Sequence, residues 1–254
     1  MKGFMNHCGG RHITREELGK LNDPVPMTET HYPIRHDYFL NEVHNALENA
    51  GYKIVHEEFS LQRFLSKKDG KLTQDNMFGL MELRNCNNHE DMAKLVGLRN
   101  SSTMQFRANM GCGNRVFVCD NLSFSANIVV GRRHTKNILK DLPKMLSGAI
   151  TELNKQFEEN EKRVEAYKAH SLDRLTAHDI IMVAMRAGAI PPSMLKPWVN
   201  TFYNPTHDAF KNRDCWSLYN AFTEVAKKWS YPTMQDRTHL LTKVMDKMVL
   251  ADAA

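Results

Sequence analysis

The sequence lacks any apolar run of about 18 residues, so it predicts no membrane span and no membrane partner. Its first residues, MKGFMNHCGGRHITREE, also lack the apolar stretch of a secretion signal. Five cysteines stand at irregular spacing, at positions 8, 86, 112, 119 and 215, and none forms a CxxC pair. This pattern indicates free thiols in a reducing cytoplasm.

Metal-binding and catalytic patterns are missing as well. His7, Cys8 and His12 lie close together, as do His31 and His36, but neither group has the paired spacing of a structural zinc site. Residues 111–114, GCGN, form a single Gly-x-Gly without the lysine of a phosphate-binding loop. The sequence therefore predicts no enzyme, no metal and no cofactor. A nuclease whose acidic residues are scattered along the chain is the least favoured of three candidate functions, and the other two involve binding without a chemical step.

Acidic residues are nearly absent between residues 94 and 140. This segment holds eight lysines and arginines against the single acid Asp120, a net +7 in a chain whose total is +5. The rest of the chain therefore carries about −2. Such a concentration of positive charge in one segment indicates a polyanionic partner.

Before this segment, apolar periodicity predicts a helix over residues 37–51 and strands over 52–66, 75–85 and 93–101. A short helix is expected over 102–113, with Ser102 or Thr103 as its cap. Residues 1–36 are rich in turn-forming residues and are interpreted as a loosely structured arm.

Residues 113–131 predict a hairpin that turns at Asp120 and Asn121, because both residue types tolerate the left-handed conformation. The expected register pairs Cys119 with Leu122, Phe117 with Phe124, and Arg115 with Ala126. The basic residues 132–140 follow directly after this hairpin.

After the hairpin, apolar residues recurring every three or four positions predict a long helix over about 137–169 and four shorter helices behind it. The expected fold class is α+β: an N-terminal antiparallel sheet with helices, a long connecting helix, then an all-α C-terminal part. The expected domains are the arm over 1–36, a nucleic-acid-binding domain over 37–170 and a helical region over 171–254.

The candidate DNA-binding residues lie in the basic segment. Its cations would contact phosphates, His134 would add a donor, and Phe106 would stack on a base. The predicted contacts are Arg99, Arg107, Arg115, Arg132, Arg133, His134, Lys136 and Lys140. The structural alternative is a solvated basic face above an ordinary core.

Two stretches, VFVCDNLSFSANIVVGRRHTKNI and RDCWSLYNAFTEV, resemble the phage- and plasmid-borne proteins of domain-of-unknown-function family 932. The matching positions are Val116 to Cys119, Asn121, Arg133 to Thr135, Trp216, Tyr219 to Ala221, Thr223 and Glu224. The likeness covers roughly residues 95–230. It implies a mobile-element setting and hence the cytoplasm of an infected bacterial host.

Two further likenesses bear on function. In size, setting and basic hairpin the chain is similar to single-stranded-DNA-binding regulators of phages that package a virion RNA polymerase. The order of its expected elements is similar to the annealing-protein fold of the Rad-fifty-two type, although a fold by itself does not imply a function.

Together these features predict a phage-encoded, non-enzymatic protein that binds single-stranded DNA in viral replication, recombination or transcription regulation. Phage or host replication and transcription proteins are expected partners. The alternative is a protein–protein module that inhibits or redirects a host enzyme. A homo-oligomer is expected, because the seam of Phe157, Val164 and Tyr167 is thin for a solitary charged helix; the face from Trp216 to Trp229 is the second candidate interface.

Overall fold

The computed structural model describes residues 10–65, 72–84, 92–116, 121–123, 128–227, 229 and 231–249. The chain divides into two compact units. The first comprises residues 1–88, 94–112 and 127–154, and the second comprises residues 89–93, 113–126 and 155–254. The division thus falls after residue 154, whereas the sequence placed a boundary after residue 170.

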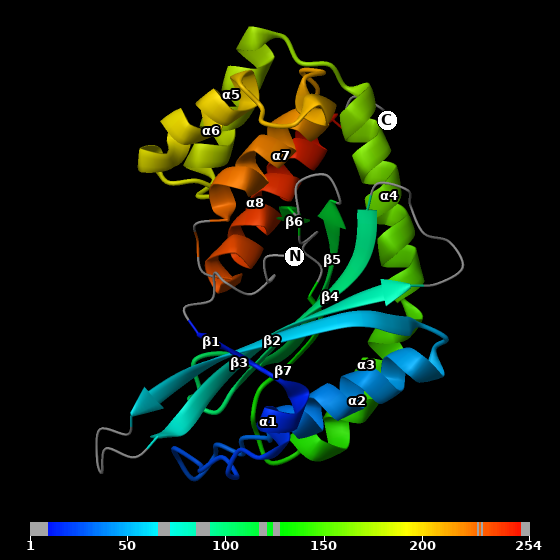
Figure 1. Cartoon of the computed structure of the whole chain (residues 1–254), viewed down its shortest axis with the longest axis vertical. Coiled ribbons are helices and arrows are strands. Elements are labelled where there is room, and N and C mark those ends of the chain that lie inside the picture. Colours follow the sequence, from blue (N-terminus) through cyan, green and yellow to red (C-terminus); the bar gives the residue numbers. More distant parts are fainter. Residues whose placement is uncertain are drawn as a thin grey trace. The chain divides into compact units, whose positions relative to one another are not determined.

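The first unit is built on a sheet with the strand order β1-β2-β3-β4-β5, to which β7 is added beside β5 (Figure 1). The strands are β1 Arg11–Ile13, β2 Lys53–Leu65, β3 Leu72–Arg84, β4 Met92–Ser101, β5 Ala108–Val116 and β7 Ile128–Arg132. The sheet is antiparallel, as the sequence predicts, and β2, β3 and β4 correspond to the three expected strands.

Two helices cover one face of this sheet, α2 His36–Asn49 and α3 Ile138–Thr151 (Figure 1). The helix α2 was predicted from its apolar spacing, and Phe39, Val43 and Leu47 are buried at successive turns. It ends before Gly51, whose φ of 82° is readily adopted only by glycine. The core of the unit therefore lies between these helices and the sheet.

Residues 10–35 are more ordered than the predicted loose arm. The strand β1 pairs with β2, and Thr14 caps the short helix α1, Arg15–Gly19, in a capping box with Glu17. The Arg15 guanidinium binds both carboxylate oxygens of Glu57 in β2, at 3.0 and 3.1 Å. Pairing with a sheet edge and a two-point ion pair thus fix a segment that local composition marked as a loop.

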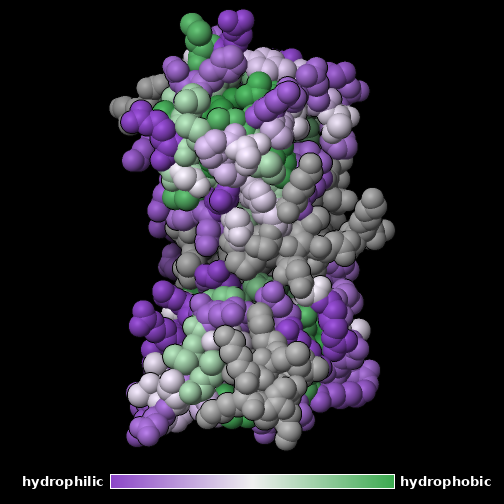
Figure 2. Space-filling model, turned by 90° about the vertical axis from the view of Figure 1, so that its left-hand side faces the viewer, coloured by the Kyte–Doolittle hydropathy of each residue, from purple (hydrophilic) through white to green (hydrophobic). Residues whose placement is uncertain are grey.

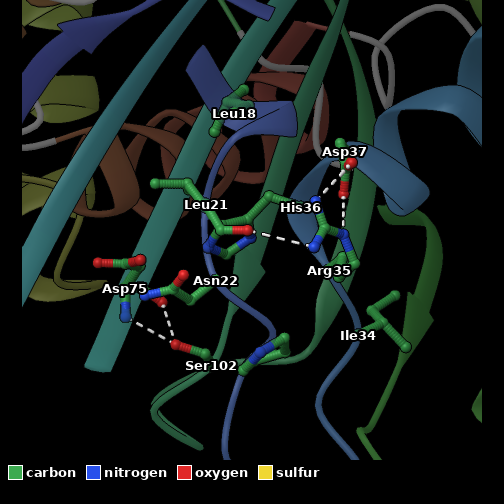
Figure 3. A pocket seen from close by; sticks show the side chains of 10 residues that line it. Leu18, Leu21, Asn22, Ile34, Arg35, His36, Asp37, Asp75 and Ser102 are labelled. Carbon is green, nitrogen blue, oxygen red and sulfur yellow. Dashed lines mark hydrogen bonds and ion pairs between the residues drawn. The ribbon is translucent and has the colours of Figure 1, made fainter. Parts of the chain in front are cut away.

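Arg35 holds the chain that follows α1 (Figure 3). Its guanidinium donates to the backbone oxygens of Gly19 and Leu21, at 2.9 and 3.2 Å, and to the carboxylates of Asp23 and Asp37. These partners raise the pKa of Arg35 above its already high ordinary value. One side chain therefore anchors the loop over residues 19–34 to the start of α2.

Two predictions for residues 102–131 are wrong. Residues 108–116 form a strand rather than a short helix, because Ala108 to Gly111 find backbone partners in β7. The predicted hairpin register is also wrong, since Arg115 pairs with Leu122 of β6 (Asn121–Ser123) instead of Ala126. Val116 lies opposite Asn121, which leaves four residues between the strands instead of a two-residue turn. The predicted pairs of Phe117 and Cys119 lie outside the described residues.

The predicted long helix is divided into α3 and α4 (Leu153–Ala169). The backbone N–H of Glu152 bonds to the carbonyl of Ala149, three residues back, which tightens the turn between them. The two helices bury their apolar residues in different compact units, Ile150 in the first and Phe157 in the second.

The described part of the second unit is mainly helical, as predicted, and β5 pairs briefly with β6 there. It contains most of α4 together with α5 Arg174–Arg186, α6 Leu195–Tyr203, α7 Cys215–Ala226 and α8 Tyr231–Val249. The helix α7 is buried on nearly all sides, and Trp198 of α6 donates its indole N–H to the Leu218 carbonyl at 3.0 Å.

The two faces that predicted a homo-oligomer are filled within this unit. Phe157, Val164 and Tyr167 are buried, and so are Trp216 and Phe222 of α7. The oligomeric state therefore stays a prediction that these faces no longer support. Among the described residues no helix is both long and apolar enough to cross a membrane.

Candidate functional site

A cavity of about 480 Å³ opens at one end of the sheet in the first unit. Three connections meet there: the arm at residues 30–31, the loop between β4 and β5 at residues 104–107, and the start of the loop from β7 to α3 at residues 133–135. The cavity brings together four of the predicted DNA contacts, Phe106, Arg107, Arg133 and His134. None of the described residues that line it is acidic.

The loop between β4 and β5 is held in place by the neighbouring strand β3. The Asn76 side chain donates to Oε1 of Gln105 at 2.6 Å and accepts from the Thr103 hydroxyl at 3.1 Å. Met104 has a φ of 61°, a conformation that costs a non-glycine residue about 1–3 kcal/mol. The network around Asn76 therefore holds a strained loop against the cavity.

Phe106 stands in this loop with its ring partly exposed. Phe78 of β3 packs on it at a centroid distance of 5.5 Å, and the Arg99 guanidinium lies 5.6 Å from the ring centroid. Arg99 thus sits against Phe106 and does not itself line the cavity. Phe106 is partly exposed and lines the cavity, where a planar ligand is able to contact it.

The two arginines that line the cavity, Arg107 and Arg133, are exposed. They come from different connections, so the fold brings together two charges that are far apart in the sequence. Thr30 and Thr135 add hydroxyl groups to the same wall. Two guanidinium groups without a neighbouring carboxylate among the described lining residues form a site suited to anions.

The other predicted cations lie elsewhere. Arg132 donates to Asp141 at 2.5 Å, so its charge is neutralised within the first turn of α3. Lys136 lines a second cavity, and Lys140 is exposed on α3. The side chain of Arg115 lies outside the described part of the chain.

His134 is buried, unlike the surface donor that the sequence predicts. Its Nε2 lies 2.7 Å from Oδ1 of Asn100, whose amide nitrogen contacts Nδ1 of His36 at 2.9 Å and the Ile34 carbonyl at 3.2 Å. Burial lowers the pKa of His36 to about 3 and that of His134 to about 4, so both rings are neutral at pH 7.

His31 completes the wall beside His134, with the two ring centroids 5.8 Å apart and nearly perpendicular. Nδ1 of His31 accepts from the backbone N–H of Met27 at 3.1 Å, and Tyr32 N–H donates to the His134 carbonyl at 2.9 Å. The sequence assigned neither His31 nor Asn100 to this site, because only the folded sheet brings them to residues 104–107 and 133–135. The signal for His31 was its closeness to His36 in the chain, which was interpreted as part of a loose arm.

Other chemistry finds little support in the described residues. They contain no group of three or more histidine, cysteine or acidic side chains that could hold a metal ion. Cys112 and Cys215 are buried and form no disulfide with a described residue, and burial raises the pKa of Cys215 to about 12. A thiol with so high a pKa is a poor nucleophile at neutral pH.

A second cavity of about 480 Å³ lies in the same unit and has a mainly apolar wall. Tyr32, Pro33 and Leu139 contribute to it together with Lys136, and Leu139 is 59% exposed. On the face shown in Figure 2, hydrophilic areas interrupt the hydrophobic ones. Scattered exposed apolar residues are ordinary on a protein surface, so Leu139 matters here through its place at a cavity.

Comparison with known proteins adds no relative: no family model, no curated protein and no solved structure matches this chain.

Proposed function

We propose that this protein binds single-stranded DNA at the cavity formed by residues 30–31, 104–107 and 133–135. The observation that carries the proposal is the convergence of Arg107 and Arg133 with Phe106, without an acidic residue in the described lining. Guanidinium groups bind phosphates through two hydrogen bonds, and an aromatic ring accepts a base by stacking.

Binding alone, without a chemical step, is the proposed activity. Exposed Lys136 and Lys140 follow residues 133–135 in the chain and would add two further positive charges for phosphates. The strand would displace counterions as its phosphates meet these cations, which makes affinity depend steeply on salt. Service in phage replication, recombination or transcription remains part of the proposal and rests on the sequence resemblance.

The test is fluorescence anisotropy with a labelled single strand, the matching duplex and the matching RNA at several salt concentrations. Four phosphate contacts would give a slope of log affinity against log salt near about −3 for the single strand. Replacing Arg107 and Arg133 together with alanine should reduce the slope by about 1.4 units. A flat salt response, or equal binding by parent and double variant, would contradict the proposal.

A charge-matched control is available in the second unit. Arg174 and Lys196 are exposed on α5 and α6 and line no part of the cavity. Their double replacement by alanine removes the same charge from the chain and should leave the salt slope unchanged. A loss equal to that of the cavity variant would show that net charge, rather than the site, controls binding.

The second candidate function is a protein–protein module that acts on a host enzyme. The apolar cavity beside Lys136, with the exposed side chain of Leu139 at its wall, favours this alternative. It becomes the better interpretation if the protein binds none of the three nucleic acids.

A further inference from the structure

His31, which lines the cavity, carries a hydrogen-bond donor that has no acceptor among the described residues. Nδ1 of His31 accepts the Met27 N–H at 3.1 Å, so a neutral ring carries its proton on Nε2. That Nε2 is buried and lacks a hydrogen-bond partner among the described residues, in a side chain that is only 4% exposed. A buried donor without an acceptor costs free energy, which a ligand with a suitable acceptor would recover.

Beside it the wall presents an acceptor. The Asn100 amide group donates both its hydrogens, to the Ile34 carbonyl and to Nδ1 of His36, and this orients Oδ1 toward His134. Nε2 of His134 must therefore carry the proton that Oδ1 accepts. Nδ1 of His134 is left with its lone pair, for which the described part of the chain shows no donor.

This pair of groups does not suit a phosphate. A phosphate offers only acceptors, and the lone pair on Nδ1 of His134 would repel it. The two rings are also neutral at pH 7, since burial lowers the pKa of His134 to about 4 and lowers that of His31. The phosphate-binding charges of the site are instead the exposed Arg107 and Arg133.

A nucleobase edge has the complementary chemistry, because every base carries acceptor and donor groups side by side in its plane. The cavity volume of about 480 Å³ lies within the range of small-molecule sites, which is about 300–1,000 Å³. Phe106 borders the same cavity and offers its ring to a planar ligand.

We infer that the cavity holds one unstacked nucleobase of the bound strand, with His31 and His134 hydrogen-bonded to its edge. The adjoining phosphates lie on Arg107 and Arg133, and Phe106 contacts the base. This inference rests on the proposed single-strand binding and adds what part of the strand the cavity recognises.

The test compares two labelled oligonucleotides of equal length and equal phosphate number, one of mixed sequence and one in which every nucleotide is abasic. The parent protein should bind the base-bearing strand at least about tenfold more tightly. Replacing Arg107 and Arg133 should weaken binding to both strands, because the abasic strand keeps its phosphates.

Two substitutions of His31 separate its two nitrogens. Asparagine in His31→Asn places an oxygen near the position of Nδ1, which can accept the Met27 N–H, but it lacks the Nε2 donor. Glutamine in His31→Gln reaches farther and supplies an amide donor near Nε2. The asparagine variant should lose most of the preference for bases with unchanged affinity for the abasic strand, and the glutamine variant should retain much of it.

His178→Asn is the control. His178 is a part-buried histidine whose Nε2 lies 3.4 Å from the Tyr203 hydroxyl, and it lines no part of this cavity. Its replacement should leave the preference for bases intact. Thermal unfolding of each variant identifies any that fails to fold.

A measurement on the parent protein complements the variants. Nitrogen chemical shifts of the histidine rings should change at Nε2 of His31 and Nδ1 of His134 with the base-bearing strand, and not with the abasic one. Equal affinity for both strands, or unchanged shifts, would overturn the base site and leave single-strand binding in place. Binding of neither strand would overturn both proposals.

Discussion

Nε2 of His134 lies 2.7 Å from Oδ1 of Asn100, and the amide nitrogen of that asparagine lies 2.9 Å from Nδ1 of His36. One asparagine side chain thus joins two buried histidines, one at the start of α2 and the other after β7. Nδ1 of His36 can accept from the amide only while that ring is neutral. Burial lowers the pKa of His36 to about 3 and that of His134 to about 4, so both rings are neutral at pH 7.

The stability of the protein should therefore depend on pH. The folded-state pKa values of about 3 and 4 lie below the ordinary histidine value of about 6.5. Between these values and about pH 6.5 the unfolded chain therefore binds more protons than the folded chain. The free energy of unfolding should fall as the pH drops below about 6.5, by up to about 1.4 kcal/mol per pH unit for each histidine. Urea unfolding between pH 7.5 and 5 measures this slope.

His36→Asn provides the control for the pH dependence. Asparagine retains an acceptor for the Asn100 amide but does not titrate, so the slope should become shallower by about one proton. An identical slope in parent and variant would show that His36 does not contribute.

The adjacent residues Arg132 and Arg133 should behave differently. Arg132 is paired with Asp141, so Arg132→Ala should lower the free energy of unfolding by about 0.2–1 kcal/mol and change DNA affinity little. Arg133 is exposed at the cavity, so Arg133→Ala should leave stability unchanged and reduce the salt slope of binding by about 0.7. Thermal unfolding and anisotropy distinguish the two; the reverse result would place the ligand on Arg132.

Arg35 should hold the segment that carries His31 to the cavity. Arg35→Lys keeps the charge but loses the forked geometry that reaches two carbonyls and two carboxylates. The expected loss of unfolding free energy is about 1–3 kcal/mol, with faster proteolysis of residues 19–34. Lys20→Ala breaks only an exposed ion pair with Glu16 and should change stability by less than about 0.5 kcal/mol.

Two glycines should respond to alanine in opposite directions. At Gly79 a methyl group would lie 2.9 Å from the Phe59 ring on the neighbouring strand, so Gly79→Ala should destabilise the protein by about 1–3 kcal/mol. At Gly148, inside α3, nothing lies within 4 Å, and Gly148→Ala should stabilise it by about 0.5–1 kcal/mol. Equal shifts in unfolding temperature would contradict the packing at Phe59.

The sequence alone was enough for the local elements. Apolar residues at Phe39, Val43 and Leu47 define one helical face, and the predicted helix corresponds to α2 because local periodicity and tertiary burial agree there. The α+β class and the three central strands were predictable for the same reason. The gathering of positive charge between residues 94 and 140 is likewise a property of composition.

Pairings between distant segments depend on the tertiary structure. Residues 108–111 look locally like a helix end, yet they form a strand because β7 supplies hydrogen-bond partners. The same applies to Arg132, whose partner Asp141 lies on the following helix and removes it from the set of available cations.

The candidate site shows most clearly which features follow from the sequence and which follow from the tertiary structure. Arg107 and Arg133 were identifiable from their charge, but their meeting at one cavity required the sheet to place two connections side by side. His31 and Asn100 carry no charge pattern that marks them in a sequence, and their roles follow from burial and from hydrogen bonds to segments far along the chain. Composition determines which charges the chain carries, whereas the protonation and the partners of a buried side chain are decided only by the groups that folding packs around it.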